Sequence, residues 1–85
     1  MPELIHVNSD SKLNQLNDIH SKKAKLVKYY MDGCGHCINL EPIWNSVETK
    51  IQNLFPNDDS AIISLNEKFM HKSKLPKVTG FPTIS

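Results

Sequence analysis

The chain has 85 residues, of which 39% are hydrophobic and 22% are charged, and its formal net charge is +1. A chain of this length makes one small domain, so we expect residues 1–85 to form a single unit. The near-neutral charge offers no basic face for nucleic acid, and no apolar run approaches the length of a membrane span. The densest basic cluster, Lys22, Lys23 and Lys25, is typical of a solvated helix end.

The N-terminus, Met1-Pro2-Glu3-Leu4, lacks the basic region and apolar core of a secretory signal peptide, which favours the cytoplasm as the default location. The expected cytoplasmic location would not apply to a fragment that has lost a targeting sequence, so a viral or secretory-pathway origin stays open. The chain contains two cysteines, at positions 34 and 37. They are too few and too close for a secreted disulfide framework, and they indicate a redox or metal-binding role.

Strands and helices are predicted to alternate from the N-terminus. Residues 4–7 form a short apolar run that predicts a strand, and the polar residues 8–10 can cap a following helix. Apolar residues at 13, 16 and 19 recur at helical spacing and predict a helix with one thin apolar stripe. Residues 25–31 are rich in β-branched and aromatic types, interrupted by Lys28, and predict a central strand covered on both faces.

A longer amphipathic helix is predicted after Cys37. Its apolar positions fall at three- and four-residue steps and predict one buried face: Leu40, Ile43, Trp44, Val47, Ile51 and Leu54. The positions expected to face outward are Asn39, Asn45, Glu48 and Gln52. The phase of Trp44 indicates a core residue. Pro42 lacks a backbone donor and predicts a kink one turn after the cysteines.

The C-terminal third continues the alternation. Residues 55–60 form a turn-rich loop, and residues 61–65 predict another buried strand. A short helix is predicted over residues 67–75, ended by Pro76, and a further strand is approached over residues 78–84.

The two cysteines stand in the stretch Cys34-Gly35-His36-Cys37, where a predicted strand gives way to a predicted helix. A thiol is nucleophilic only as its thiolate, which the unpaired N–H groups of a helix N-terminus and a cationic His36 both favour. We therefore expect Cys34 to be the attacking thiol, tuned by Gly35-His36. Cys37 lies one turn further along the same face, from which it can close a disulfide with Cys34 or release a mixed disulfide.

The order βαβαβα, with Cys-Gly-His-Cys opening the second helix and Gly80-Phe81-Pro82-Thr83 beginning the next strand, resembles the thioredoxin fold. More narrowly, the chain is similar to a catalytic domain of the protein disulfide isomerase family, from about residue 4 to its end. The resemblance implies an α/β domain whose central sheet is flanked by helices. It also implies a thiol–disulfide oxidoreductase or isomerase that acts on protein or peptide thiols and disulfides and needs no organic or metal cofactor.

The resemblance also assigns substrate-binding positions. In this fold the proline at the place of Pro82 is cis and faces the cysteine pair, whereas an X-Pro bond in a folded protein is cis only about 5–6% of the time. The residue before it, here Phe81, offers backbone groups to an extended substrate segment. Gly33 stands where a tryptophan commonly contacts substrates, and Asp32 stands where that family has proline, so the apolar contact surface is reduced.

Two further departures carry consequences. Lys28 occupies the position, six residues before the first cysteine, of the family's buried acid. Two readings of Lys28 stay open: it lowers the thiol pKa values and favours the reduced form, or it extends to solvent and tunes nothing. The hairpin strand and helix that normally follow the cis proline are absent, which implies a fragment, a truncated reading frame, or a domain completed by a partner.

Alternative functions remain for the cysteine pair. A non-catalytic thioredoxin-like binding or assembly module is one. Zinc is a less favoured one, because tetrahedral coordination needs two more ligands and the four histidines are not at zinc-finger spacing. Haem attachment is excluded, because Ile38 and not histidine follows Cys37.

Overall fold

Four strands form one mixed sheet in the order β1-β3-β2-β4 in the computed structural model, which describes residues 1–20 and 23–85. The strands β1 (Glu3–Val7), β3 (Ala61–Asn66) and β2 (Ala24–Tyr30) are parallel neighbours. The short strand β4 (Thr83–Ile84) pairs antiparallel with β2. Lys22, part of the predicted lysine cluster, lies outside the described residues.

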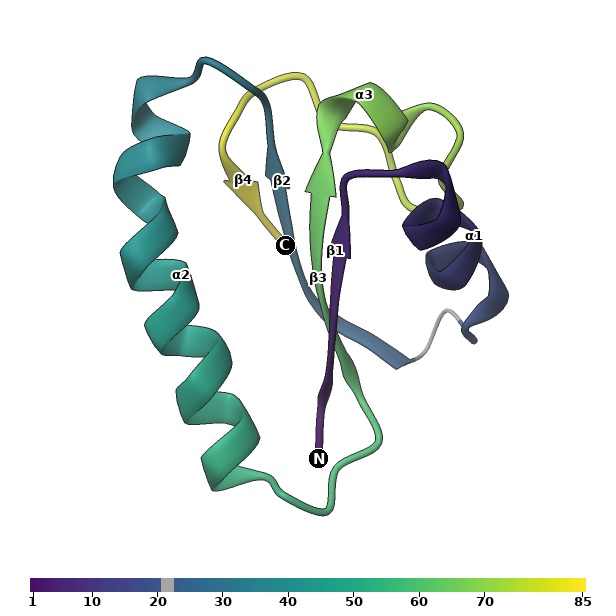
Figure 1. The fold of residues 1–85 in the computed structure, drawn as a ribbon, viewed down its shortest axis with the longest axis vertical. Helices are drawn as coiled ribbons and strands as arrows, with labels where there is room; N and C mark the ends of the chain where they lie inside the picture. Colours follow the sequence, from purple (N-terminus) through teal and green to yellow (C-terminus); the bar gives the residue numbers. More distant parts are fainter. Residues whose placement is uncertain (21–22) are drawn as a thin grey trace.

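Helices cover both faces of this sheet (Figure 1). Helix α2 (Gly35–Leu54) lies along one face, and α1 (Asp10–Asp18) and α3 (Glu67–Met70) lie on the other. The element order β1-α1-β2-α2-β3-α3-β4 confirms the predicted thioredoxin-like α/β order. Among the described residues, no helix is both long and apolar enough to cross a membrane.

The local signals explain where the helices begin and end. Ser9 caps α1, since its hydroxyl accepts the backbone N–H of Lys12 at 3.4 Å. Helix α3 ends at Met70, so the predicted helix over residues 67–75 is too long. The cause is a tighter turn: the backbone N–H and the hydroxyl of Ser73 both donate to the Met70 carbonyl, at 3.1 and 2.8 Å.

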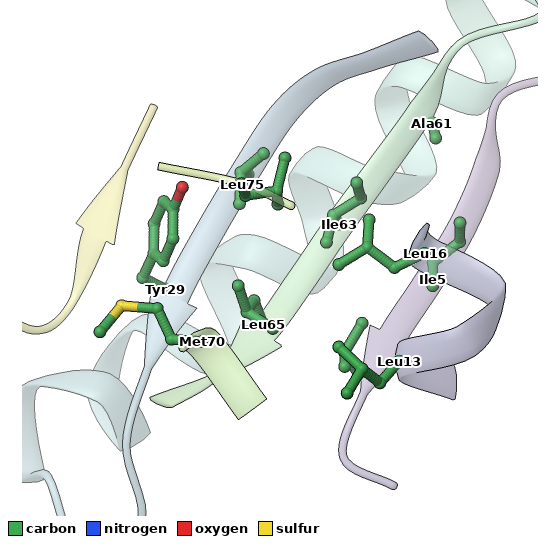
Figure 2. Packing of buried hydrophobic residues seen from close by; sticks show 11 residues of the cluster. Ile5, Leu13, Leu16, Tyr29, Ala61, Ile63, Leu65, Met70 and Leu75 are labelled. Atoms are coloured by element: carbon green, nitrogen blue, oxygen red, sulfur yellow. The ribbon is translucent and has the colours of Figure 1, made fainter. Parts of the chain in front are cut away.

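The apolar core lies on the face of the sheet that α1 and α3 cover (Figure 2). Alternate residues of each strand point to this face, because successive strand side chains point to opposite sides. The cluster comprises Ile5, Val7, Val27, Tyr29, Ala61, Ile63 and Leu65 from the strands, Leu13 and Leu16 from α1, Met70 from α3, and Leu75. The hydroxyl of Tyr29 donates to the carbonyl of Pro76 at 2.9 Å, which satisfies its polar group.

The opposite face, under α2, is more polar than the sequence predicts. Only three residues of α2 are fully buried, namely Cys37, Trp44 and Glu48, and they recur at steps of seven and four. The prediction that Glu48 faces outward is therefore wrong: it is 3% exposed. Ile43 and Leu54, predicted to be buried, are 62% and 71% exposed, because they lie to the side of this stripe. Trp44 is confirmed as a core residue.

Candidate functional site

The two cysteines sit where the chain leaves β2 and enters α2. Cys34 is the N-cap of α2 and Cys37 lies in its first turn, and both are free thiols and buried. The backbone N–H of Cys37 donates to Cys34 Sγ at 3.2 Å. The sulfur of Cys34 therefore takes the place of the side-chain oxygen that usually caps a helix, and it receives the partial positive charge of the helix N-terminus.

The segment around Pro82 faces the first cysteine. The sulfur of Cys34 lies 3.9 Å from the carbonyl oxygen of Phe81, to which its S–H group is placed to donate. The Phe81–Pro82 peptide bond is cis. Pairing of β4 with β2, in which Thr83 lies opposite Tyr29, holds this segment beside the start of α2. The site is thus assembled from two segments that are far apart in the sequence.

The loop before Cys34 is tied to the start of α3. Lys68 Nζ lies 2.8 Å from Asp32 Oδ2, and the Asn66 amide donates to Asp32 Oδ1 at 3.1 Å. These two contacts, the hydrogen bond from Lys68 first, lower the pKa of the Asp32 carboxyl. Gly33 then adopts a positive φ of 72°, a left-handed conformation that favours glycine. Glycine at position 33, where the resemblance would lead one to expect tryptophan, thus suits the left-handed backbone found there.

A cleft of about 310 Å³ lies behind the second cysteine, and its lining includes Cys37, Lys28, Glu41, Trp44 and His6. Lys28 is only 7% exposed, so the reading in which it extends to solvent is wrong. Its ammonium group lies 5.0 Å from the ring centre of Tyr30 and 5.5 Å from that of Trp44, within cation–π range.

The ionisation of Lys28 and Cys37 is shifted in opposite directions. Burial lowers the pKa of Lys28, and the charges of Glu48, Glu41 and Cys37 offset part of that effect. Burial also raises the pKa of the Cys37 thiol, as does its hydrogen bond with Cys34, while a hydrogen bond with the Met31 backbone and the charge of Lys28 lower it. Each group thus favours the charged form of the other.

The remaining predicted positions are more exposed. Gly33, Gly35 and His36 are exposed around the entrance to α2, and Phe81 and Pro82 are half-buried beside Cys34. The structure places Cys34 beside both Cys37 and Phe81. Lys28 and Cys37 line one cleft, and Phe81 and Pro82 are not part of its lining.

Sequence reasoning missed three polar residues under α2. The indole N–H of Trp44 donates to the Ser64 hydroxyl at 2.8 Å, and His6 Nε2 lies 2.8 Å from Glu48 Oε2. The signal was present for Glu48, which stands four residues after Trp44 and eleven after Cys37 and hence shares their face. Among the described residues, no group of three or more histidine, cysteine or acidic side chains is arranged to hold a metal ion.

Comparison with known proteins adds to this geometry. The thioredoxin family model matches residues 3–85. A protein disulfide-isomerase of Schizosaccharomyces pombe is 28% identical over 88 residues, which cover 95% of this chain and 23% of that protein. Protein disulfide-isomerase A4 of Homo sapiens is 35% identical over 65 residues, covering 74% of this chain and 10% of that protein.

The Drosophila melanogaster protein disulfide-isomerase is 27% identical over 66 residues, covering 78% of this chain and 12% of that protein. The chain thus spans at most about a quarter of the length of these relatives. No solved structure gives a significant match. The fold, the Cys-x-x-Cys pair at the start of α2 and the family match agree, and the chain belongs to the thioredoxin family, with partial similarity to protein disulfide isomerases.

Proposed function

We propose that the protein is a thiol–disulfide oxidoreductase or isomerase that acts on protein or peptide disulfides. The observation that carries the proposal is the position of Cys34, whose sulfur accepts the Cys37 N–H at 3.2 Å and lies 3.9 Å from the Phe81 carbonyl. A sulfur in this place has the helix terminus on one side and a substrate-accessible backbone segment on the other.

The chemistry follows from this arrangement. The Cys34 thiolate attacks one sulfur of a substrate disulfide, the substrate S–S bond breaks, and one substrate thiolate leaves. The Cys37 thiolate then attacks Cys34 Sγ, the mixed disulfide breaks, and the second substrate thiolate leaves. Two electrons pass from the enzyme dithiol to the substrate, and the reverse sequence oxidises a substrate dithiol. If a second substrate thiolate attacks the mixed disulfide before Cys37 does, a new substrate S–S bond forms, the Cys34 thiolate leaves, and the substrate is isomerised without net transfer of electrons.

The other predicted residues have supporting roles in this proposal. Phe81 and Pro82 hold the substrate chain, Gly33 lines its path, and Gly35-His36 adds a cationic side chain beside Cys34. Lys28 stabilises the Cys37 thiolate and so favours the dithiol over the disulfide. All these groups belong to the protein, so the proposed reaction needs no added cofactor.

Turnover of a peptide disulfide by the wild type and by the Cys34→Ser and Ser46→Ala variants tests the proposal. Ser46 is an exposed residue of α2 and serves as the control. We expect Cys34→Ser to abolish turnover and Ser46→Ala to retain it. Equal rates for all three proteins, or none for the wild type, would instead favour the non-catalytic binding module. Metal analysis of the purified protein tests the zinc alternative separately.

A further inference from the structure

Two oppositely charged residues are buried under α2, on the face of the sheet where an apolar core would be expected. Lys28 on β2 is 7% exposed and Glu48 on α2 is 3% exposed. Burying ionisable groups costs several kcal/mol per ion unless other groups compensate. Buried charges beside a reactive thiol therefore call for a functional explanation.

Lys28 depends on distant charges to remain protonated. In the described part of the chain, no carboxylate lies within ion-pair distance of its ammonium group, whose closest aromatic neighbours are Tyr30 and Trp44 at 5.0 and 5.5 Å. Of the charges that favour its protonated form, that of Glu48 has the largest effect, ahead of Glu41 and Cys37. Burial opposes all three.

Glu48 is held in place by a residue of the sheet. His6 on β1 approaches it with Nε2 2.8 Å from Oε2, and the side chain of His6 is 52% exposed. The pair joins α2 to β1. Glu48 lies one helical turn after Trp44, whose ring centre is 5.5 Å from the Lys28 ammonium, and the charge of Glu48 favours the protonated form of Lys28.

We propose that Glu48, held by His6, is a positioning residue for the cysteine pair that acts through Lys28: it keeps the Lys28 ammonium charged in the cleft, and this ammonium stabilises the Cys37 thiolate. Cys37 releases its proton to solvent, so no other acceptor is required. The inference rests on the proposed function, because it assigns a role in setting the redox properties of the same site.

The positions of the other ionisable groups around Lys28 also favour an effect of Glu48 on its charge. The ionisable groups that line the cleft with Lys28 and Cys37 are Glu41 from α2, Tyr30 from β2, Asp32 from the loop after it, and His6 from β1. Glu48 lies outside this lining, and its charge also favours protonation of Lys28. Asp32 already has a partner in Lys68 at 2.8 Å. Glu48 is the carboxylate that is both fully buried and fixed, and Coulomb attraction is strongest where water is excluded.

The test measures the ionisation of Cys37 in a Cys34→Ser background, where it is the only thiol. Glu48→Gln removes the charge and keeps an oxygen that can accept from His6. Thiolate formation is followed by ultraviolet absorbance against pH and by the rate of iodoacetamide alkylation at neutral pH. The matched control is Glu67→Gln on α3, at the other face of the sheet.

We expect Glu48→Gln to slow Cys37 alkylation roughly three- to tenfold, which corresponds to an upward pKa shift of about half a unit to one unit. Glu67→Gln should leave the rate unchanged. With Lys28→Met also present, Glu48→Gln should no longer slow alkylation, because the group through which it acts is missing. A slowing of the same size in that background, or none in the presence of Lys28, would overturn the proposal.

These measurements need no turnover, so they are separable from a failure of the proposed function. If the intact cysteine pair proves inactive, the Cys34→Ser series still reports whether Glu48 acts on Cys37 through Lys28. If the pair is active, Glu48→Gln should also give a more reducing potential, and Glu67→Gln should not. Amide exchange of the buried strand β3 checks that every variant keeps the fold.

Discussion

The sulfur of Cys34 lies 3.9 Å from the carbonyl oxygen of Phe81, although 47 positions separate the two residues in the sequence. The antiparallel pairing of β4 with β2 brings them together, because Cys34 follows β2 and Phe81 precedes β4. The attacking thiol and the backbone that would hold a substrate are thus placed by the sheet, and not by a single loop.

The order of attack can be tested by trapping. In a Cys37→Ala variant, Cys34 can still attack a substrate disulfide, but no second thiol remains to release the product. We expect a stable mixed disulfide to accumulate, seen by mass spectrometry as protein plus one substrate half. The Cys34→Ala variant should accumulate much less, because burial raises the pKa of the remaining Cys37 thiol and only Cys34 lies beside the Phe81 carbonyl. Equal trapping by both variants would reverse the assigned roles.

Gly33 reduces the apolar surface expected to contact substrates, and its backbone conformation also favours glycine. Its φ of 72° is a conformation that costs a residue with a side chain about 1–2 kcal/mol. We expect Gly33→Ala to lower the free energy of unfolding by about 1 kcal/mol in urea titrations. Gly35→Ala is the matched control, because Gly35 has no positive φ and a Cβ there meets no neighbouring atom within 4 Å. Equal losses for both variants would contradict the strain argument.

The bond between Trp44 and Ser64 fixes α2 on the sheet. Both residues are buried, and the indole N–H donates at 2.8 Å. Ser64→Ala leaves this N–H without its acceptor, which costs about 1–3 kcal/mol. Ser46→Ala, which removes an exposed hydroxyl from α2, should cost far less. Urea unfolding of the two variants makes the comparison, and a loss for Ser64→Ala no larger than that for Ser46→Ala would show that the bond does not stabilise the helix.

Burial of Lys28 predicts a distinct dependence of stability on pH. Because its pKa is lowered in the folded protein, the unfolded chain holds the proton more tightly, and stability rises with pH until the unfolded-state pKa of about 10.4 is passed. The wild type should therefore gain stability, relative to Lys28→Met, as the pH rises through the lowered folded-state pKa of Lys28 towards the unfolded-state value. Lys25→Met, at an exposed position of the same strand, should behave as the wild type. Parallel curves for wild type and Lys28→Met would refute this effect.

Much of the fold could be predicted because local patterns and global structure agree. The cap at Ser9, the apolar strands and the strand-to-helix junction at Cys34 each follow from short stretches of sequence. The end of α3 could not be predicted, because it depends on a turn in which Ser73 bonds to Met70, and the helical pattern alone continues past it.

The buried polar residues under α2 could not be predicted for a different reason. An amphipathic pattern assigns polar residues to solvent, whereas the buried Glu48 is compensated by its contact with His6 and by the charge of Lys28. The buried position of Lys28 brings its ammonium group over the aromatic rings of Tyr30 and Trp44, which come from separate elements. Such contacts are decided by the tertiary structure.

The central claim is that Cys34 and Cys37 form a reversible redox pair. The most direct measurement equilibrates the protein with reduced and oxidised glutathione at many ratios, blocks free thiols by alkylation, and reads the mass of each species. We predict a single two-electron transition between a doubly alkylated dithiol and an unalkylated disulfide. A protein that remains fully alkylated across the whole range of ratios would contradict the account.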